Sequence, residues 1–446
     1  MNLKSTVFNS KRNYLIGKIE LFLLALVFIS VFFQIFPYYE GKFLITYYFS
    51  TIAFVIVALF QILNFEGFHF NKSILLIYFF FSCLLMYGLV SIFFSQNQDD
   101  GFRHLHLRFM SFFIFYVITQ VLKTKKRIKI YEFIILVCVV WNIGVCVWEI
   151  ATLQHLPVSK FHDELSFIPT GSFNNENDLP AILLLCCSIL FFMKGKFLNY
   201  ISITIMLILF IIMGVQGSRL VMLTLFPFLL YKFLFKTSKL YKLTVILLVS
   251  LIVSYIFINY PLVRFLTIKR IKEHVLSFGF EAKSQRLGST SIRKELYVIS
   301  LEKFSESYGF GVGTGNFEKT NSPQRLISTN LIIVPHSIFF ETVATEGFIG
   351  LFFLCVIVFS SLLPLINNES RKSIFDLLKI KLLSENEKQL LVFMLFFIVS
   401  VSVPASIRSY FIYWNILGYY YCLMYVKDTC ESDNLMFKPN LIIQFS

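Results

Sequence analysis

Long apolar runs recur along this 446-residue chain and constrain its fold more than any other feature. Runs of about 17–25 residues are long enough to cross the roughly 30 Å hydrocarbon core of a membrane as α-helices. The runs are continuous rather than alternating, which excludes the strands of a transmembrane β-barrel. Only 15% of the residues are charged, whereas soluble domains are near a quarter charged. The sequence therefore predicts an all-α polytopic membrane protein.

We expect about twelve membrane helices within a single integral membrane domain, residues 1–446. The first apolar run has no small-residue cleavage site after it, so it is interpreted as a retained anchor. The expected helices are Leu21–Phe36, Phe43–Leu63, Ile74–Phe94, Leu105–Leu122, Ile130–Ile150, Leu179–Met193, Phe197–Met213, Leu220–Phe235, Leu243–Tyr260, Ser337–Leu365, Leu390–Val403 and Tyr410–Val426.

Charge in the connections predicts the orientation. The formal net charge is +14, and most of the excess lies in short clusters in every second connection, such as Lys123–Lys129 and Lys232–Lys242. This is the pattern that orients membrane proteins rather than a nucleic-acid-binding surface. It predicts that both termini are cytoplasmic and that the long loop, residues 261–335, is external.

Two short motifs open helices on the predicted external side. In Gly171-Ser172-Phe173-Asn174-Asn175-Glu176-Asn177-Asp178, the side chain of Asn177 or Asp178 either caps the following helix or, like that of Asn175, contacts a ligand. In Gly217-Ser218-Arg219, the guanidinium lies at a positive helix end, where a cation is unfavourable on dipole grounds. Arg219 therefore either reaches lipid headgroups or lies beside a bound anion.

The long external loop is rich in Lys and Arg, including Arg286 and Arg293. Its segment Ser291–Phe304 has helical periodicity, with Ile292, Leu296 and Ile299 on one face, and such a helix can lie on the membrane surface. The following "GFGVGTGNF" contains Gly311 and Gly313 and predicts a tight turn. It is not a dinucleotide-binding fingerprint, because no βαβ unit surrounds it.

The stretch "VPHSIFFETVATEG" opens the tenth predicted helix. Histidine titrates near neutral pH, so His336 is a candidate general base, or else an interfacial histidine bonded to backbone or lipid. Glu341 and Glu346 lie deeper in the apolar run, where ionisable groups are rare and costly. Glu346 is either functional or the structural partner of an arginine on another helix. Glu341 has no specific role from the sequence.

The order of these motifs resembles the O-antigen ligase and O-antigen polymerase superfamily. The quoted residues are "GSFNNENDLP", "GSR", "IRKELYVISLEKF", "GFGVGTGNF" and "HSIFFETVATEGFIG", and they extend over residues 171–350. Two positions depart from the family pattern. Glu176 replaces the usual proline, and Ser337 replaces the usual asparagine after His336, which leaves no side-chain amide there.

The resemblance implies a metal-independent, inverting glycosyltransferase without a cofactor, in a fold similar to other polytopic lipid-linked glycosyltransferases (GT-C-like). The donor would be an oligosaccharide on undecaprenyl diphosphate, and the acceptor a glycan (polymerase) or lipid A–core (ligase), on the external face of the bacterial cytoplasmic membrane. The products would be O-antigen, capsule or exopolysaccharide, and a chain-length regulator protein is a possible partner. By this resemblance His336 is the catalytic base, and Glu346, Gly311 and Gly313 support the site. Arg219 and Arg293 hold the diphosphate, and Arg286, Asn175 and Asn177 are further substrate contacts.

Two other classes remain open. A transporter or flippase of lipid-linked glycans also needs many helices and cationic groups, although transporters tend to place ionisable groups near the midplane. A metal-dependent transferase would use Asp99 and Asp100, or Asp163 and Glu164. The cysteines lie in apolar runs or in the C-terminal tail, so neither a zinc site nor a disulfide framework is expected.

Overall fold

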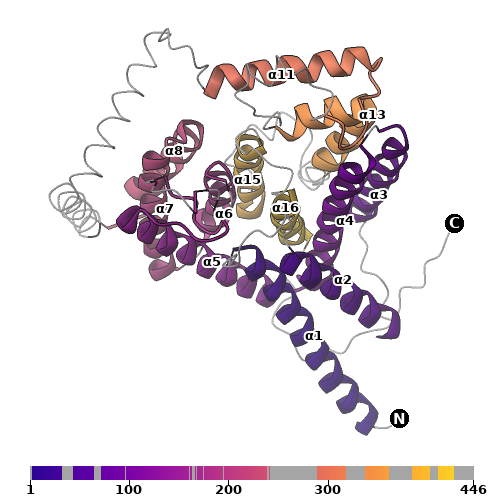
Figure 1. Cartoon of the computed structure of the whole chain (residues 1–446). Coiled ribbons are helices and arrows are strands. Elements are labelled where there is room, and N and C mark those ends of the chain that lie inside the picture. Colours follow the sequence, from indigo (N-terminus) through magenta and orange to yellow (C-terminus); the bar gives the residue numbers. More distant parts are fainter. Residues whose placement is uncertain are drawn as a thin grey trace, which may run out of the picture.

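A computed structural model shows a helical protein (Figure 1). It describes residues 3–32, 44–64, 72–95, 97–159, 161–162, 166, 168–173, 175–193, 195–238, 241, 289–317, 337–360, 384–401 and 410–425. The helices are α1 (Leu3–Phe32), α2 (Leu44–Asn64), α3 (Lys72–Phe93), α4 (Gln98–Val121), α5 (Lys125–Thr152), α6 (Asp178–Phe192), α7 (Lys196–Gln216), α8 (Arg219–Phe235), α11 (Ser289–Glu306), α13 (Ile338–Ser360), α15 (Glu385–Val401) and α16 (Tyr410–Tyr425).

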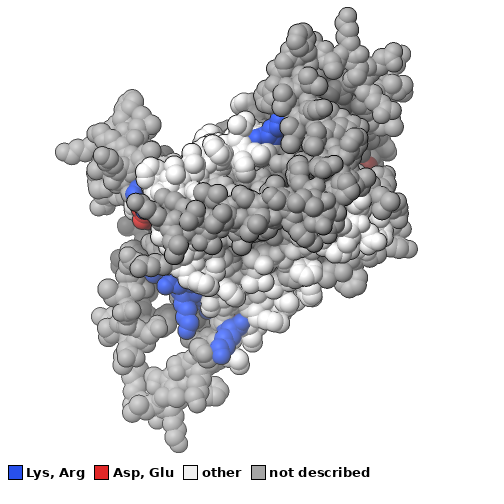
Figure 2. Space-filling view, turned by 90° about the vertical axis from the view of Figure 1, so that its left-hand side faces the viewer, with Lys and Arg blue, Asp and Glu red and all other residues white. Residues whose placement is uncertain are grey.

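The helices agree with the apolar pattern. Each predicted membrane helix has an observed counterpart except Leu243–Tyr260, which lies outside the described residues. By length and apolar composition, four described helices qualify to cross a membrane, namely Ile74–Phe93, Lys125–Thr152, Phe197–Gln216 and Ile338–Ser360. On the face in Figure 2, described Lys and Arg side chains are visible near the top, at the left edge and at the lower left, beside a largely uncharged described surface. Both observations fit a chain with several membrane passes.

The C-terminal helices form the centre of the core. α16 packs against α4, and α15 packs against α6, so that together they connect the α3–α4–α13 side of the bundle to the α5–α8 side. Tyr419 and Tyr420 of α16 are fully buried, and their rings stack on Tyr131 and Phe393 respectively. Their hydroxyls bond to Glu132 Oε1 and Ser188 Oγ, both at 2.7 Å. Since burying a hydroxyl group without a hydrogen-bond partner is costly, these hydrogen bonds allow the two tyrosine side chains to be buried in the core.

α11 lies along one edge of the bundle, beside α13 (Figure 1). Its apolar residues Leu296 and Ile299 are buried and cluster with Phe317 and Ala344. The expectation that this face lies on the membrane surface is therefore wrong for these two residues, because α13 and the loop after α11 cover them. The side chain of Ile292 is outside the described part of the chain.

Candidate active site

A buried carboxylate holds the loop that precedes α6. Glu149, in the last turn of α5, has no exposed surface. Its oxygens accept hydrogen bonds from Thr170 N and Thr170 Oγ1, both at 2.9 Å, and from Gly171 N at 2.7 Å. Such bonds satisfy a carboxylate that would otherwise be very costly to bury. Glu149 thus fixes the start of the asparagine loop (residues 168–173 and 175–177) against α5.

His155 completes this arrangement. Its Nδ1 lies 2.8 Å from Glu149 Oε1, and its Nε2 lies 2.8 Å from Ser166 O. A carbonyl oxygen and a carboxylate oxygen are hydrogen-bond acceptors, so the protonated imidazole, in which both ring nitrogens donate, fits both partners. Burial lowers the pKa of His155, but the hydrogen bond and negative charge of Glu149 outweigh it, and the pKa is raised from its usual value. The result is a buried ion pair beneath the loop.

The middle of the asparagine loop is held by α5. Asn142 Oδ1 accepts from Ser172 N at 3.0 Å, and Trp141 Nε1 donates to Ser172 Oγ at 3.1 Å. At Gly171 φ is +59°, and a Cβ there would lie 2.9 Å from Asn142 Oδ1. Glycine is therefore required by both backbone conformation and space.

Asn175 and Asn177 bond to each other. Asn175 Oδ1 accepts from Asn177 N at 3.0 Å and from Asn177 Nδ2 at 3.3 Å, which is an Asx turn. Asn177 occupies the N-cap position of α6, but its side chain makes no capping hydrogen bond. The capping interpretation of Asn177 is therefore wrong. Both residues are partly exposed, so they remain accessible to a ligand.

Gln216 joins the asparagine loop to the turn that carries Arg219. It is the last residue of α7, and its Nε2 donates to Pro169 O at 3.0 Å and to Glu176 O. Gly217 then adopts a left-handed conformation with φ +80°, and Arg219 begins α8 and is half-buried. The structure thus brings the first two sequence motifs together at one end of α6, α7 and α8.

A second group forms where the glycine segment (residues 309–317) meets a break in α13. Gly347 has φ +64° and ψ −154°, which interrupts the helix. The carbonyls of Ala344 and Thr345 accept from Val312 N and Gly313 N, both at 2.9 Å, and Phe348 N donates to Gly309 O at 2.9 Å. The glycine segment therefore supplies backbone partners at the break, where helical hydrogen bonds are interrupted.

Two glycines at this contact have no space for a side chain. A Cβ on Gly311 would lie 2.5 Å from the carbonyl of Thr345, and one on Gly347 would lie 2.1 Å from Gly309 O. Both glycines have positive φ, +81° and +64°. The tight turn predicted around Gly311 and Gly313 is thus a backbone-to-backbone docking of the segment onto α13.

Glu346 lies within this contact and is fully buried. It forms an ion pair with Arg108 of α4 and accepts from Thr314 Oγ1 at 3.0 Å. Thr314 Oγ1 in turn lies 2.7 Å from Ser91 Oγ of α3. The ion pair corresponds to the second of the two alternatives for Glu346, which was a structural partner of an arginine on another helix. Together with the bonds of Thr314, it links α3, α4, α13 and the glycine segment. Glu341, one turn earlier, is also buried.

Arg293 lies on α11, the helix that packs against α13. It is half-buried on α11, one turn before Tyr297, whose ring stacks on Phe340 with centroids 4.1 Å apart and planes at 12°. Burial raises the pKa of the Tyr297 hydroxyl, against the effect of the nearby Arg293 charge. Arg293 is thus one helical turn from a residue that contacts the start of α13, which Ser337 precedes.

Several predicted residues lie outside the described residues. These are His336, Arg286, Asp163 and Glu164. Asp100 is described, and it accepts a hydrogen bond from Asn97 Nδ2. Within the described part of the chain, no group of three or more His, Cys, Asp or Glu side chains has an arrangement that would hold a metal ion.

Sequence reasoning missed three residues that build the site, Glu149, His155 and Gln216. A signal was present for the first. Glu149 stands in an apolar run, where an ionisable group is uncommon enough to be a functional candidate. For Gln216 and His155 the sequence contains no comparable signal, because their partners are backbone carbonyls and a side chain brought near by the fold.

Known proteins resemble this chain in sequence. Residues 204–355 match the family described as O-antigen ligase. The chain is also 26% identical, over 358 residues, to the teichuronic acid biosynthesis protein TuaE of Bacillus subtilis (strain 168), an alignment that covers 77% of this chain and 70% of that protein. The family match includes Arg219, Arg293, the glycine segment and Glu346, and begins after the asparagine loop.

Proposed function

Because residues 204–355 match the O-antigen ligase family and the chain is similar to a teichuronic acid biosynthesis protein, we propose that it belongs to the O-antigen ligase and O-antigen polymerase superfamily. We propose further that it is a multi-pass membrane glycosyltransferase that assembles bacterial surface polysaccharide. In this proposal, a glycan passes from undecaprenyl diphosphate to an acceptor sugar hydroxyl at the external face of the cytoplasmic membrane. The acceptor is either the next repeat unit (polymerase) or a final anchor such as lipid A–core (ligase). A single membrane domain of the GT-C-like type belongs to the same proposal.

The observation that carries the proposal is the position of Arg219. It begins α8 beside the asparagine loop, held there by the hydrogen bonds from Gln216 to Pro169 O and Glu176 O. A helix N-terminus attracts anions, and guanidinium binds phosphate oxygens through two parallel hydrogen bonds. The two together suit a diphosphate. Asn175 and Asn177, in the loop to which Gln216 donates, are proposed contacts of the same donor.

Arg293 is the second proposed diphosphate contact. α11 packs on α13 through the Tyr297–Phe340 stack and the Leu296–Ile299 face, which directs this part of the external loop to the start of α13. Arg286, in the same loop, is proposed as a further phosphate contact. Negative charge develops on the leaving phosphate in the transition state. Cations beside it therefore stabilise the transition state more than the bound donor, and this lowers the barrier.

His336 is the proposed general base, immediately before Ser337 and α13. The acceptor hydroxyl oxygen bonds to the anomeric carbon as its proton passes to His336. The bond from that carbon to phosphate oxygen breaks, and undecaprenyl diphosphate leaves with the electron pair. Attack opposite the leaving group inverts the anomeric configuration. In the proposed mechanism this transfer step requires neither a metal ion nor a nucleotide.

The remaining predicted residues support this site. Glu346 anchors Arg108 and Thr314, and Gly311 and Gly313 allow the glycine segment to dock on α13. We propose that this contact fixes the start of α13, and so His336, relative to the external loop.

A transfer assay with purified protein in detergent tests the proposal. With an undecaprenyl-diphosphate-linked oligosaccharide and a matching acceptor glycan, the protein should form the longer glycan, also in the presence of EDTA. A flippase would form no product, because detergent removes the two compartments that it connects. Loss of transfer in EDTA, with recovery on adding a divalent cation, would instead support the metal-dependent class.

A deletion strain separates polymerase from ligase. Single-repeat glycan attached to its final anchor is expected after loss of a polymerase, because the ligation step is intact. Full-length chains remaining on the lipid carrier are expected after loss of a ligase. A chain-length regulator is expected as a partner only in the first case.

A further inference from the structure

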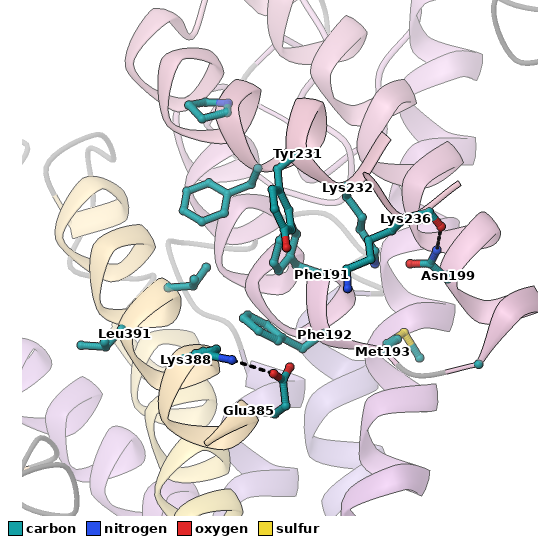
Figure 3. Close-up of a pocket in the computed structure, with 14 residues that line it drawn as sticks. Phe191, Phe192, Met193, Asn199, Tyr231, Lys232, Lys236, Glu385, Lys388 and Leu391 are labelled. Carbon is teal, nitrogen blue, oxygen red and sulfur yellow. Dashed lines mark hydrogen bonds and ion pairs between the residues drawn. The ribbon is translucent and has the colours of Figure 1, made fainter. Parts of the chain in front are cut away.

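A cavity of about 840 Å³ lies at the opposite ends of α6, α7 and α8 from the asparagine loop. It is formed by the end of α6, the start of α7, the end of α8 and the start of α15 (Figure 3). Its size is within the roughly 300–1,000 Å³ of small-molecule sites. The family motifs described above lie elsewhere, so glycan transfer does not account for it. The lining residues used below are Phe191, Phe228, Lys232, Lys236, Lys388 and Leu391.

Lys232 is the unusual residue of this cavity. It is only 3% exposed, in a helix of an apolar protein where a buried ammonium is costly. Its Nζ donates to Leu190 O at 3.1 Å and to Ser202 Oγ, and lies 5.5 Å from the centre of the Phe191 ring. Among the described residues, no carboxylate forms an ion pair with it. The lysine is therefore oriented by neutral acceptors, and no carboxylate within the described residues pairs with it.

Two more lysines line the cavity from opposite sides. Lys236 is exposed and directly follows the last residue of α8, one turn after Lys232, while Lys388 comes from α15 (Figure 3). Lys388 Nζ is 2.9 Å from Glu385 Oε1, but this pair is solvent-exposed, so its mutual attraction is weak. The lining has three lysines and one glutamate, which gives a net positive charge. Phe191, Phe228 and Leu391 provide apolar surface beside it.

The charge pattern predicts that this cavity lies at the cytoplasmic membrane boundary. The connection after α6 contains Lys194 and Lys196, and the one after α8 contains Lys236, Lys239 and Lys242. Clusters of this kind mark the cytoplasmic side. Anionic lipid headgroups give that leaflet a negative surface potential, and basic pockets between helices on this side bind such headgroups.

We propose that this cavity binds an anionic glycerophospholipid, with the headgroup phosphate among the three lysines and an acyl chain against the apolar walls. The phosphate supplies an anion for Lys232, which has no carboxylate partner among the described residues. Phe191, Phe228 and Leu391 would bury part of the chain from water, which favours a lipid over a soluble phosphate. This site is separate from the proposed transfer site and does not depend on it.

Native mass spectrometry of the full chain in detergent tests the proposal. The protein is mixed with phosphatidylglycerol or with phosphatidylcholine of identical acyl chains, and retained lipid is counted. Phosphatidylglycerol should be retained about 10-fold better. The double variant Lys236→Gln/Lys388→Gln should lose most of this preference, and Lys232→Met should abolish it. Lys126→Gln removes an exposed lysine from the first turn of α5 and should change nothing.

The outcomes separate the alternatives. Equal retention of the two lipids, or an unchanged preference in the double variant, overturns the proposal. Displacement of phosphatidylglycerol by equimolar inorganic phosphate also overturns it, since it would show a site for free phosphate. If Lys232→Met lowers the melting temperature strongly, the lipid preference of the double variant still tests the proposal. Lys236 is exposed and Lys388 is partly exposed, so replacing them should not unfold the protein.

Discussion

Arg108 of α4 and Glu346 of α13 form an ion pair in which the Glu346 side chain has no exposed surface. Glu346 is bound at the same time to Thr314 of the glycine segment. One carboxylate thus connects two helices and the loop that docks at the break in α13. The pair lies one residue before the break at Gly347.

Breaking the pair should destabilise the protein strongly. Glu346→Gln removes the buried carboxylate that pairs with the mostly buried Arg108 guanidinium, and breaking such a pair costs about 3–5 kcal/mol. The melting temperature in detergent should fall clearly. The control is Glu306→Gln, which breaks an exposed i,i+3 pair with Lys303 and should cost about 0–1 kcal/mol. Equal losses in the two variants would contradict a structural role for the Arg108–Glu346 pair.

Gly311→Ala should displace the glycine segment from α13. The new Cβ would lie 2.5 Å from the Thr345 carbonyl, and φ at this residue is +81°. The backbone conformation alone costs about 1–3 kcal/mol for a non-glycine residue, and the overlap adds to it. Thermal unfolding measures the loss. Gly144→Ala is the matched control, since nothing lies within 4 Å of its Cβ, and a helical alanine there should be neutral or stabilising. A similar change in both variants would show that the close contact is unimportant.

His155 predicts a pH-dependent stability. Its pKa is raised in the folded protein by Glu149, despite burial. The stabilisation is therefore fully present below the ordinary histidine value of about 6.5 and is lost as pH rises through the raised folded value. The melting temperature should decline over this interval. In His155→Gln the decline should be absent, because glutamine does not titrate. An identical pH slope in the two proteins would assign the effect to another group.

The helix positions and the motif order could be predicted from the sequence, because apolar runs and their basic flanks reflect the membrane directly. The break at Gly347 was not predicted, since a single glycine inside an apolar run does not distinguish a kink from a straight helix. The partner of α11 was also not predictable, because an amphipathic face fits a membrane and another helix equally well. Arg108 could be assigned to Glu346 only once the fold had brought α4 and α13 together.

Arg219 should not be replaceable by lysine. A point charge does not reproduce the two parallel hydrogen bonds of guanidinium to a diphosphate. Losing one charge-assisted bond costs about 1.5–3 kcal/mol, so the transfer rate of Arg219→Lys should fall roughly 10- to 100-fold. Arg103→Lys, at an exposed position of α4, is the control and should retain activity. Near-full activity of Arg219→Lys would favour contact with lipid headgroups instead.

The central claim is that the chain transfers a glycan with His336 as the base. The most direct measurement is the rate of transfer by purified His336→Ala, alongside donor binding by the same sample. The account predicts a rate lower by about 10²- to 10⁴-fold with donor binding unchanged, because the arginines hold the diphosphate. Wild-type transfer by His336→Ala would contradict it.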